Sequence, residues 1–355
     1  MQKTQTQPST DWPLLAITQG DPAGIGPEII AKAFRDAPER MRGCFVVGEV
    51  QTLRRAVQCI QRPGKCSLPV AVIDQPADAR HMPPRCLPVL PLPGLPGPLP
   101  WGQVQAEAGR AAAACVQWAA RAALRGDIAG LVTAPLNKEA LALAGVHFPG
   151  HTELLQAEAA QHAGVPVADM PVRMMLANDA LRTVLVSIHV SLRDAIEAVT
   201  TANVLQTIQI THAALLRSLG RAPRIAVAGL NPHAGEAGLM GREEIAFIAP
   251  AVAAAQAQGM QVWGPEAPDT VFMRARNAPG KAGEFDVVVA MYHDQGLIPV
   301  KYLGLDQGVN VSLGLPLVRT SPDHGTAFDI AGQGVADAAS LVEAVHIARQ
   351  LTGGL

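Results

Sequence analysis

Short apolar runs alternate with helical patterns along most of this 355-residue chain, and this alternation limits the fold more than any other feature. The apolar runs predict strands at 14–18, 44–48, 70–73, 128–133, 183–188, 224–229 and 285–291. The segments between them predict helices at 27–36, 50–60, 103–125, 152–163, 191–218, 241–258 and 336–350. Such a pattern is typical of an α/β architecture with a parallel or mixed sheet.

The composition agrees with a folded chain that has a sizeable core. Hydrophobic residues make up 49% and charged residues 16%, which excludes a disordered chain. The length predicts one large domain or two domains. The net charge of −2 and the lack of a basic block argue against nucleic acid as a main partner.

The cysteines and the N-terminal segment indicate the compartment. The count of five cysteines is odd and no CxxC spacing occurs, so we expect reduced thiols in a cytoplasmic protein. The first residues contain no apolar leader region, and no uninterrupted apolar stretch is long enough to span a bilayer. We therefore expect neither secretion nor a membrane span.

Residues 83–100 contain eight prolines. Because proline lacks an amide donor, we expect an extended surface connection there and not a central strand. A proline-rich ligand for another protein is the less favoured interpretation.

Three histidines follow apolar runs and precede polar, glycine-containing loops: His189, His233 and His293. Strands that end at one edge of a sheet bring the loops after them into one crevice. Three imidazoles there would form an open metal site with room for a substrate. The alternative is that these are three unrelated polar loop residues.

A glycine-rich turn at 18–30 follows the first predicted strand and opens the first predicted helix. Gly20, Gly24 and Gly26 permit a tight turn and a close approach of the backbone to a ligand. Their spacing is not the dinucleotide-binding GxGxxG pattern, and the turn could simply join strand to helix.

Two further strand-to-helix segments contain candidate anion-binding residues. Asn137 and Lys138 could meet an anion at a helix N-terminus, or Asn137 could merely cap that helix. In FPGHTELL, Thr152 is a candidate N-cap, whereas His151 is not needed for capping and is a candidate ligand-binding residue. In NPHAGE, Glu236 is a candidate partner that orients His233.

The run from 292 to 334 concentrates polar side chains between glycines. Its lysine, arginine and asparagine suit a phosphorylated or carboxylated substrate. The candidate residues are His293, Asp294, Lys301, Asn310, Arg319 and His324.

These motifs resemble known enzymes. GDPAGIGPE and HGTAFDIAGQG resemble an early turn and a late adenosine-lining loop of the metal-dependent isocitrate and isopropylmalate dehydrogenases. GHTE, NPHAGE, YHDQG and RTSPDHGTA, in this order, resemble the 4-hydroxythreonine-4-phosphate dehydrogenase family of pyridoxal phosphate biosynthesis. That family includes 4-phosphothreonate and 4-phosphoerythronate dehydrogenase relatives, and the resemblance runs from about 17 to about 334.

The resemblance implies a fold and an assembly. We expect two α/β/α domains around a cleft, as in the isocitrate and isopropylmalate dehydrogenases. Residues 1–140 with 305–355 would form the terminal domain and carry the nucleotide-binding loop. Residues 141–304 would form the middle domain and carry the metal ligands and the interface of a homodimer whose active sites are shared.

The resemblance also implies the roles of the candidate residues. One divalent ion, zinc, magnesium or cobalt, would be bound by His189, His233 and His293. The substrate would be bound by His151, Thr152, Lys301, Asn310 and Arg319. The cofactor, NAD or NADP, would lie against Gly24, Gly26, His324, Gly325, Thr326 and Asp329. Asp294 and Lys301 are the candidates for the catalytic proton acceptor.

The reaction implied is oxidation of 4-phosphohydroxy-L-threonine at C3, followed by decarboxylation to 3-amino-2-oxopropyl phosphate. The GDPAGIGPE turn and the segment around His189 look closer to the relatives that act on 4-phospho-D-threonate or erythronate and give dihydroxyacetone phosphate. Two other classes remain as alternatives: a metal-dependent sugar-phosphate hydrolase or aldolase, and a non-catalytic module that binds a phosphorylated ligand.

Overall fold

The computed structural model describes residues 12–61, 63–64, 66–304 and 308–353. In this part of the chain, twelve strands form one sheet in the order β3-β4-β2-β1-β5-β12-β11-β6-β7-β10-β8-β9. Neighbouring strands are parallel except in the pairs β12–β11, β11–β6 and β6–β7. The strands are β1 (Leu15–Thr18), β2 (Cys44–Gly48), β3 (Val70–Val72), β4 (Leu87–Pro91), β5 (Gly130–Thr133), β6 (Arg173–Ala177), β7 (Arg182–Leu185), β8 (Ile225–Ala228), β9 (Val262–Glu266), β10 (Val287–Ala290), β11 (Val309–Leu313) and β12 (Arg319–Pro322).

Helices cover both faces of this sheet, and the α/β class predicted from the sequence is confirmed. The helices are α1 (Gly26–Asp36), α2 (Val50–Cys59), α3 (Ala106–Arg125), α4 (Lys138–Leu143), α5 (His151–Ala163), α6 (Leu192–Glu197), α7 (Thr201–Leu219), α8 (Ala249–Ala257), α9 (Val271–Ala275), α10 (His293–Leu303) and α11 (Ala339–Leu351). A π-helical turn, Glu244–Ile248, leads into α8. Shorter 3-10 segments lie at Pro76–His81, Val167–Asp169 and Pro232–Gly238.

The predicted helices follow from local signals in most places. For example, α3 is rich in alanine and ends at Gly126, whose φ of 81° allows the left-handed C-cap. The predicted helix at 191–218 is two helices, because Thr200 accepts a hydrogen bond from the Asn203 amide and starts α7 after a break at 198–200.

The proline-rich segment corrects the sequence prediction. It contains β4, a buried strand paired on both sides between β2 and β3. On the β2 side, pairing begins at Val89, after Pro88, and ends at Pro91, the last residue of the strand. In the β2–β4 ladder the missing amide donors therefore fall at the ends, where proline is tolerated, whereas Pro88 is the middle of the three residues that pair with β3.

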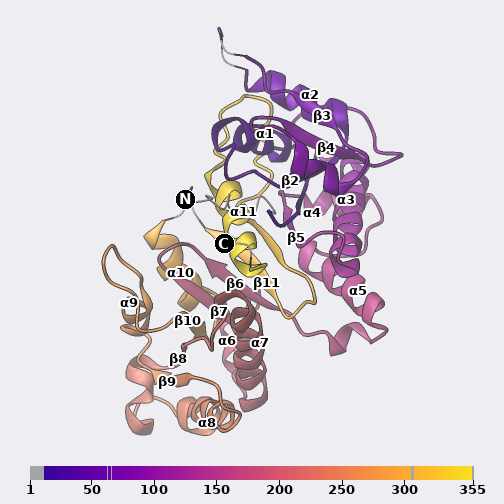
Figure 1. Ribbon diagram of the computed structural model, residues 1–355. Coiled ribbons are helices and arrows are strands. Elements are labelled where there is room, and N and C mark those ends of the chain that lie inside the picture. The colour runs from indigo at the N-terminus through magenta and orange to yellow at the C-terminus, as the bar shows by residue number, and fades with distance from the viewer. Residues whose placement is uncertain (1–11, 62, 65, 305–307, 354–355) are drawn as a thin grey trace, which may run out of the picture.

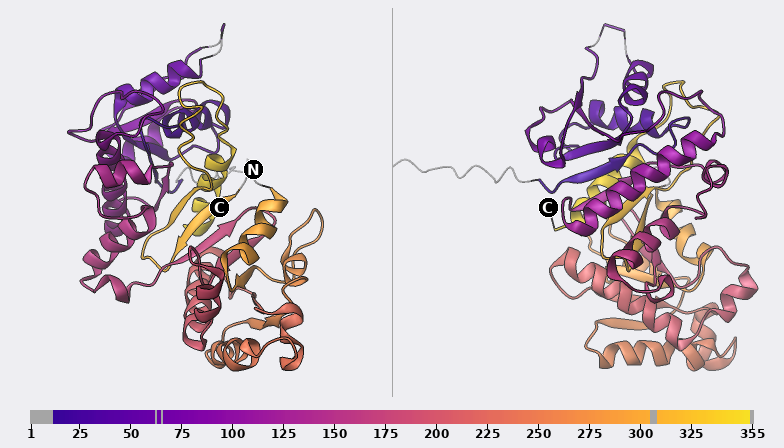
Figure 2. Two further views of the ribbon diagram at one scale, coloured as in Figure 1. Left: turned by 180° about the vertical axis from the view of Figure 1, so that it is seen from behind. Right: turned by 90° about the vertical axis from the view of Figure 1, so that its right-hand side faces the viewer.

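The sheet has two halves that meet at β11. One large core runs along a single face and joins α1, α2 and α11 in one half to α7 and α8 in the other. On the opposite face the cores are separate: one joins α3 and α5 to the first half, and the other joins α9 and α10 to the second. Figures 1 and 2 show β11 and α11, both from the C-terminal part of the chain, between the two halves. The division into domains near 140 and 305 stays a prediction.

None of the described helices has the length and apolar character that crossing a membrane requires.

Candidate functional site

A pocket of about 720 Å³ is lined by both halves of the chain. Its floor comes from β11 and β12, whose residues alternate in character. Val309, Val311 and Leu313 belong to the large core, whereas Asn310 and Ser312 line the pocket. Because successive side chains of a strand point to opposite faces, the sequence VNVSL places its polar residues in the pocket. We call this the central pocket.

Arg319, at the start of β12, is the buried cation of the central pocket. It is 4% exposed, and its Nε and Nη2 donate to Thr133 Oγ1 at 3.0 and 2.8 Å. A third bond, from Nη1 to Ser312 Oγ, is 3.3 Å long. Burial lowers the pKa of Arg319 to about 10, so its guanidinium stays charged at neutral pH. These neutral partners fix the side chain and leave its charge available to an anion.

His151 and Thr152 line the same pocket from the start of α5. Burial, and then the charge of Arg319, hold the pKa of His151 well below its usual range. Its Nε2 is buried without a hydrogen-bond partner, so this neutral ring has a free polar atom. The prediction that Thr152 caps this helix is wrong. α5 begins at His151, so Gly150 occupies the N-cap position and Thr152 lies inside the helix.

The three candidate metal ligands follow three adjacent parallel strands. β10 lies between β7 and β8, with Ala290 paired to Leu185 and Val289 paired to Val227. His189, His233 and His293 therefore follow the carboxyl ends of neighbouring strands. The rings of His189 and His293 are 5.7 Å apart between centroids, and His189 also lines the central pocket.

His233 lies in an unusual backbone segment. Residues 233 to 237 all have positive φ values between 44° and 80°, which form a left-handed turn. Four of these five residues are not glycine, and such strain is often found at functional sites. Across the described residues, the three histidines do not form a group whose ligand atoms all lie within 4.8 Å of one another.

A buried carboxylate holds the loop that contains His233. Glu244 is 2% exposed and accepts hydrogen bonds from the amides of Leu230 and Asn231 at 2.8 and 2.7 Å. Glu236, the candidate partner of His233, is exposed, as His233 itself is, and its orienting role stays a prediction. Glu244 was missed because it lies beyond the loop, in the π-helical turn.

The candidate proton acceptors lie on α10. Lys301 forms an ion pair of 2.8 Å with Asp323, which lines the central pocket. Asp294 is exposed and its Oδ1 lies 2.7 Å from Nδ1 of His293. Neither Asp294 nor Lys301 is itself in the pocket lining, so each would reach the central pocket through a neighbour.

The two segments proposed for the cofactor contact each other. The amide of Ile25 donates to the carbonyl of Thr326 at 3.0 Å. A Cβ on Gly24 would lie 2.9 Å from that carbonyl oxygen, so no larger residue fits there. His324 and Gly325 continue from this contact into the lining of the central pocket.

The remaining cofactor candidates flank this contact. A Cβ on Gly26 would meet the Gln19 carbonyl at 2.6 Å, and the Asp329 carbonyl accepts a hydrogen bond from Gln333. Glu28 accepts from the amides of Gly334 and Ala336, which ties α1 to the end of the loop. The role of Glu28 in holding this loop could not be deduced from its place in the glycine-rich turn.

Of the two polar residues after β5, Asn137 stabilises a helix and Lys138 lines the central pocket. Asn137 caps α4, since its side chain accepts from the Ala140 amide at 2.8 Å. Lys138 lines the central pocket. The capping role considered for Asn137 is therefore confirmed.

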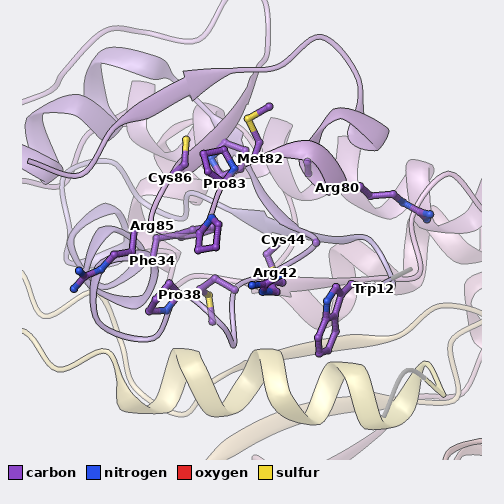
Figure 3. Close-up of a pocket in the computed structure, with 15 residues that line it drawn as sticks. Trp12, Phe34, Pro38, Arg42, Cys44, Arg80, Met82, Pro83, Arg85 and Cys86 are labelled. Carbon is purple, nitrogen blue, oxygen red and sulfur yellow. The ribbon is translucent and has the colours of Figure 1, made fainter. Parts of the chain in front are cut away.

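A second, smaller pocket lies beside the beginning of β2 and contains none of the predicted site residues. Its volume is about 120 Å³, and Figure 3 shows Trp12, Cys44 and Cys86 in its lining. This volume is below the usual range for small-molecule sites, about 300–1,000 Å³. The central pocket is within that range.

The chain is similar to known dehydrogenases over almost its whole length. A 4-hydroxythreonine-4-phosphate dehydrogenase of Beijerinckia indica is 51% identical over 339 residues, which cover 95% of this chain and 94% of the relative. A D-threonate 4-phosphate dehydrogenase of Salmonella typhimurium is 46% identical, over 95% of this chain and 98% of the relative. The crystal structure of a 4-hydroxythreonine-4-phosphate dehydrogenase from Klebsiella pneumoniae is 43% identical and superposes with a TM-score of 0.86, over 97% of this chain and 99% of that one.

The family described as pyridoxal phosphate biosynthetic protein PdxA matches residues 40–348. This match and the relatives above cover both halves of the sheet and the whole lining of the central pocket. The chain belongs to the PdxA family.

Proposed function

We propose that this protein is an NAD(P)- and divalent-metal-dependent dehydrogenase that oxidises 4-phosphohydroxy-L-threonine at C3. Decarboxylation then gives 3-amino-2-oxopropyl phosphate, a step of pyridoxal phosphate biosynthesis. The observation that carries this proposal is the central pocket, in which Arg319, Asn310, His151 and Thr152 lie together in a chain 51% identical to a dehydrogenase with this substrate in its name.

The chemistry of the pocket suits a small dianionic substrate. Arg319 offers a fixed guanidinium, and Lys138 adds a second cation in the lining. Asn310 and Thr152 add uncharged polar groups that can orient a hydroxyl or phosphate. Two cations, with neutral groups between them, would hold a phosphate and a carboxylate at opposite ends of the substrate.

The chemistry of the candidate residues suits the implied metal and cofactor, although the ligand atoms of the three histidines do not all lie within 4.8 Å of one another. Imidazole suits several divalent ions, and the rings of His189 and His293 are close enough to face one ion. Gly24 lets the glycine-rich turn pack directly against Thr326 and Phe328, which brings together the two segments proposed to hold the dinucleotide. When bound, the ion supplies a Lewis acid and the nicotinamide accepts the hydride.

The protein's own groups then position the substrate and move its proton. Arg319 and Lys138 bind the anionic groups, and the neutral His151 can exchange a hydrogen bond with the substrate without adding charge. We propose that Asp294, beside His293, accepts the proton of the C3 hydroxyl. The other candidate, Lys301, is an ammonium in its ion pair with Asp323 and could accept this proton only after giving up its own. For this proton transfer, a general base must lie within hydrogen-bonding reach of the hydroxyl, either directly or through one water.

A homodimer with shared active sites is part of this proposal. It is supported by exposed apolar side chains beside His189 and His233. Leu239 is 82% exposed, and its exposed neighbours in sequence include Met240, Ile245 and Phe247. A further group near His189 consists of Val190, Leu192 and Ile196. Apolar groups of this kind mark an interaction surface.

A second candidate is oxidation of 4-phospho-D-threonate or erythronate to dihydroxyacetone phosphate. The observation that favours it is the 46% identity to a D-threonate 4-phosphate dehydrogenase over almost the whole chain. The two substrates differ at C2, which carries an ammonium group in one and a hydroxyl in the other. Glu153 in the pocket lining is the negative side chain that could respond to this difference.

The deciding experiment follows reduced-nicotinamide formation by metal-loaded protein with both substrates, each with NAD⁺ and with NADP⁺. A higher kcat/KM for phosphohydroxythreonine supports the biosynthetic role, and a higher value for phosphothreonate supports the second candidate. Absence of reduction with both substrates, when metal is bound, would contradict a dehydrogenase and favour the hydrolase or aldolase class.

A further inference from the structure

Asp179, Glu343 and His346 form a compact group outside the central pocket. Each offers one ligand atom, and these three atoms all lie within 4.8 Å of one another. Among the described residues, no other set of three or more acidic, histidine or cysteine side chains meets this measure. The group lies at the β6–β7 turn, which precedes β7, whereas His189 follows β7. It is therefore separate from the candidate metal ligands of the central pocket.

Glu343 carries an oxygen that the protein leaves without a partner. Its side chain is 7% exposed, and Arg40 Nη1 lies 3.3 Å from Oε2. The other oxygen, Oε1, is buried and has no hydrogen-bond donor. A buried carboxylate oxygen without a donor is unfavourable unless a cation or a proton fills the space. Burial, and then the neighbouring Asp179 carboxyl, which is within hydrogen-bonding reach, raise the pKa of Glu343. A proton or a cation between the two carboxyl groups would relieve this repulsion.

The sequence and the local structure suit metal ligation. Glu343 and His346 are three residues apart on α11, so their side chains lie on the same side of the helix. Gln350 lies 2.9 Å from Nε2 of His346 and helps to orient the ring. Asn178 accepts from the amides of Ala180 and Leu181, which fixes the turn that carries Asp179. Ligands on such rigid supports bind with less loss of freedom.

Burial lowers the pKa of His346, and the positive charges of three nearby arginines lower it further, so a cation would bind here against their repulsion. Arg40 is about half exposed and bonds only the oxygen Oε2 of Glu343, where it can support a ligand carboxylate. Arg349 points elsewhere, toward the Arg42 carbonyl and Cys44, and Arg182 bonds Gln350. A hollow of about 740 Å³ includes Asp179 and Glu343 in its lining and gives an ion access from solvent.

We propose that Asp179, Glu343 and His346 form a second, structural divalent-cation site that clamps the β6–β7 turn to α11. One imidazole nitrogen and two carboxylate oxygens are ligands that zinc accepts, with water completing a tetrahedron. The site joins residues from the middle of the chain to its last helix, across the junction of the two halves of the sheet.

The test measures zinc bound to chelator-treated protein by equilibrium dialysis and elemental analysis. It uses a background variant, His189→Asn with His293→Asn, so that the candidate ions of the central pocket do not contribute. In this background we expect one zinc per chain and a rise in Tm on adding ZnCl₂. Adding Asp179→Asn or His346→Asn should weaken zinc binding at least about tenfold.

A matched control is His162→Asn, an exposed histidine on α5, which should leave zinc binding unchanged. Far-UV circular dichroism checks that each variant is folded. The proposal is overturned if the background binds no zinc, as expected for a shared proton, or if both ligand variants bind zinc as well as the background does. The zinc content of the parent protein is measured separately. If the central metal site does not exist, the parent and the background will bind the same amount of zinc, and this result says nothing against the second site.

Discussion

At the scale of single residues, the central pocket depends on polar groups that are buried before any ligand arrives. Burial lowers the pKa of His151, and the positive charge of the nearby Arg319 guanidinium lowers it further. At this position the pocket thus has one positive group, Arg319, beside a neutral ring, and not a pair of adjacent cations. This difference decides how a phosphate or carboxylate is bound.

Replacement of Arg319 by Ala should raise KM for the phosphorylated substrate by about one to two orders of magnitude, since a charged hydrogen bond is lost. Arg319→Lys keeps the charge but loses the fork held by Thr133, so an intermediate KM is expected. Steady-state kinetics measures both. Arg110→Ala, at an exposed ion pair on α3, is the control and should leave KM unchanged. An unaltered KM in Arg319→Ala would remove Arg319 from substrate binding.

Asp21 is a buried carboxyl in the glycine-rich turn. It is 1% exposed, and its Oδ2 has no partner, while Oδ1 accepts from the Ala23 amide. Burial, only partly opposed by that hydrogen bond, raises its pKa from 3.8 to about 6. Since the folded state holds this proton more tightly than the unfolded state, the Asp21 contribution to stability falls as pH rises from about 4 to above 6.

Asp21→Asn should therefore stabilise the protein at pH 8, by on the order of 1–3 kcal/mol, and have a smaller effect at pH 5. The amide keeps an oxygen for the Ala23 amide and cannot ionise. Thermal or urea unfolding at the two pH values measures this, with Asp74→Asn at an exposed position as control. An equal effect at both pH values would show that burial of charge is not the cause.

At the scale of elements, the sequence predicts helices and parallel strands better than the strands around the pocket. Runs such as 44–48 are uniformly apolar because both faces are covered, and their bounds match β2. β11 has the pattern VNVSL, with only every second residue in the core, and lies among glycines, so it was not recognised. β4 was missed because prolines argue against an internal strand unless the pairing register is known, and the register becomes visible only in the structure.

The site shows the same division. The rule that loops after parallel strands share one sheet edge is enough to bring His189, His233 and His293 to neighbouring strands. Sequence spacing could not provide the contact between Gly24 and Thr326, which are about 300 residues apart, or the buried bonds of Glu244. These contacts form between segments that are far apart in the sequence, and local sequence patterns do not show which distant segments will pack together.

Gly24→Ala should disturb the contact between the β1–α1 turn and the 324–334 loop. The added Cβ would lie 2.9 Å from the Thr326 carbonyl oxygen and 3.0 Å from its Cβ, so one segment must move. We expect a loss of about 1–3 kcal/mol in stability and a higher KM for the nicotinamide cofactor. Gly97→Ala, where a Cβ would meet nothing within 4 Å, is the matched control. If both variants behave like the parent, this contact is not important for the cofactor.

At the scale of the whole molecule, a single core on one face holds the two halves of the sheet together, while the separate cores on the other face leave space for the central pocket. The exposed apolar side chains are near the candidate metal ligands of the second half. We propose that this group of side chains forms the subunit interface, which would bring the partner close to the candidate metal ligands.

Leu239→Asp should shift the proposed dimer toward monomer, because Leu239 is 82% exposed in the single chain and a charge would be buried in the interface. Sedimentation velocity over a range of concentrations measures the shift. Val72→Asp is the control: Val72 is 51% exposed, on the edge strand β3 of the other half, and should not affect assembly. A parent protein that sediments as a monomer at all concentrations would contradict the dimer.

The position of β12 has a consequence for synthesis on the ribosome. β12 pairs with β5, almost 200 residues earlier in the chain, and β11 pairs with both β12 and β6. Until residues 309–322 have left the exit tunnel, β5 and β6 each keep an open edge with unpaired amides and carbonyls. Open edges of this kind can pair with the wrong chain. The nascent protein is therefore exposed to mispairing at β5 and β6 until its last strands have been made.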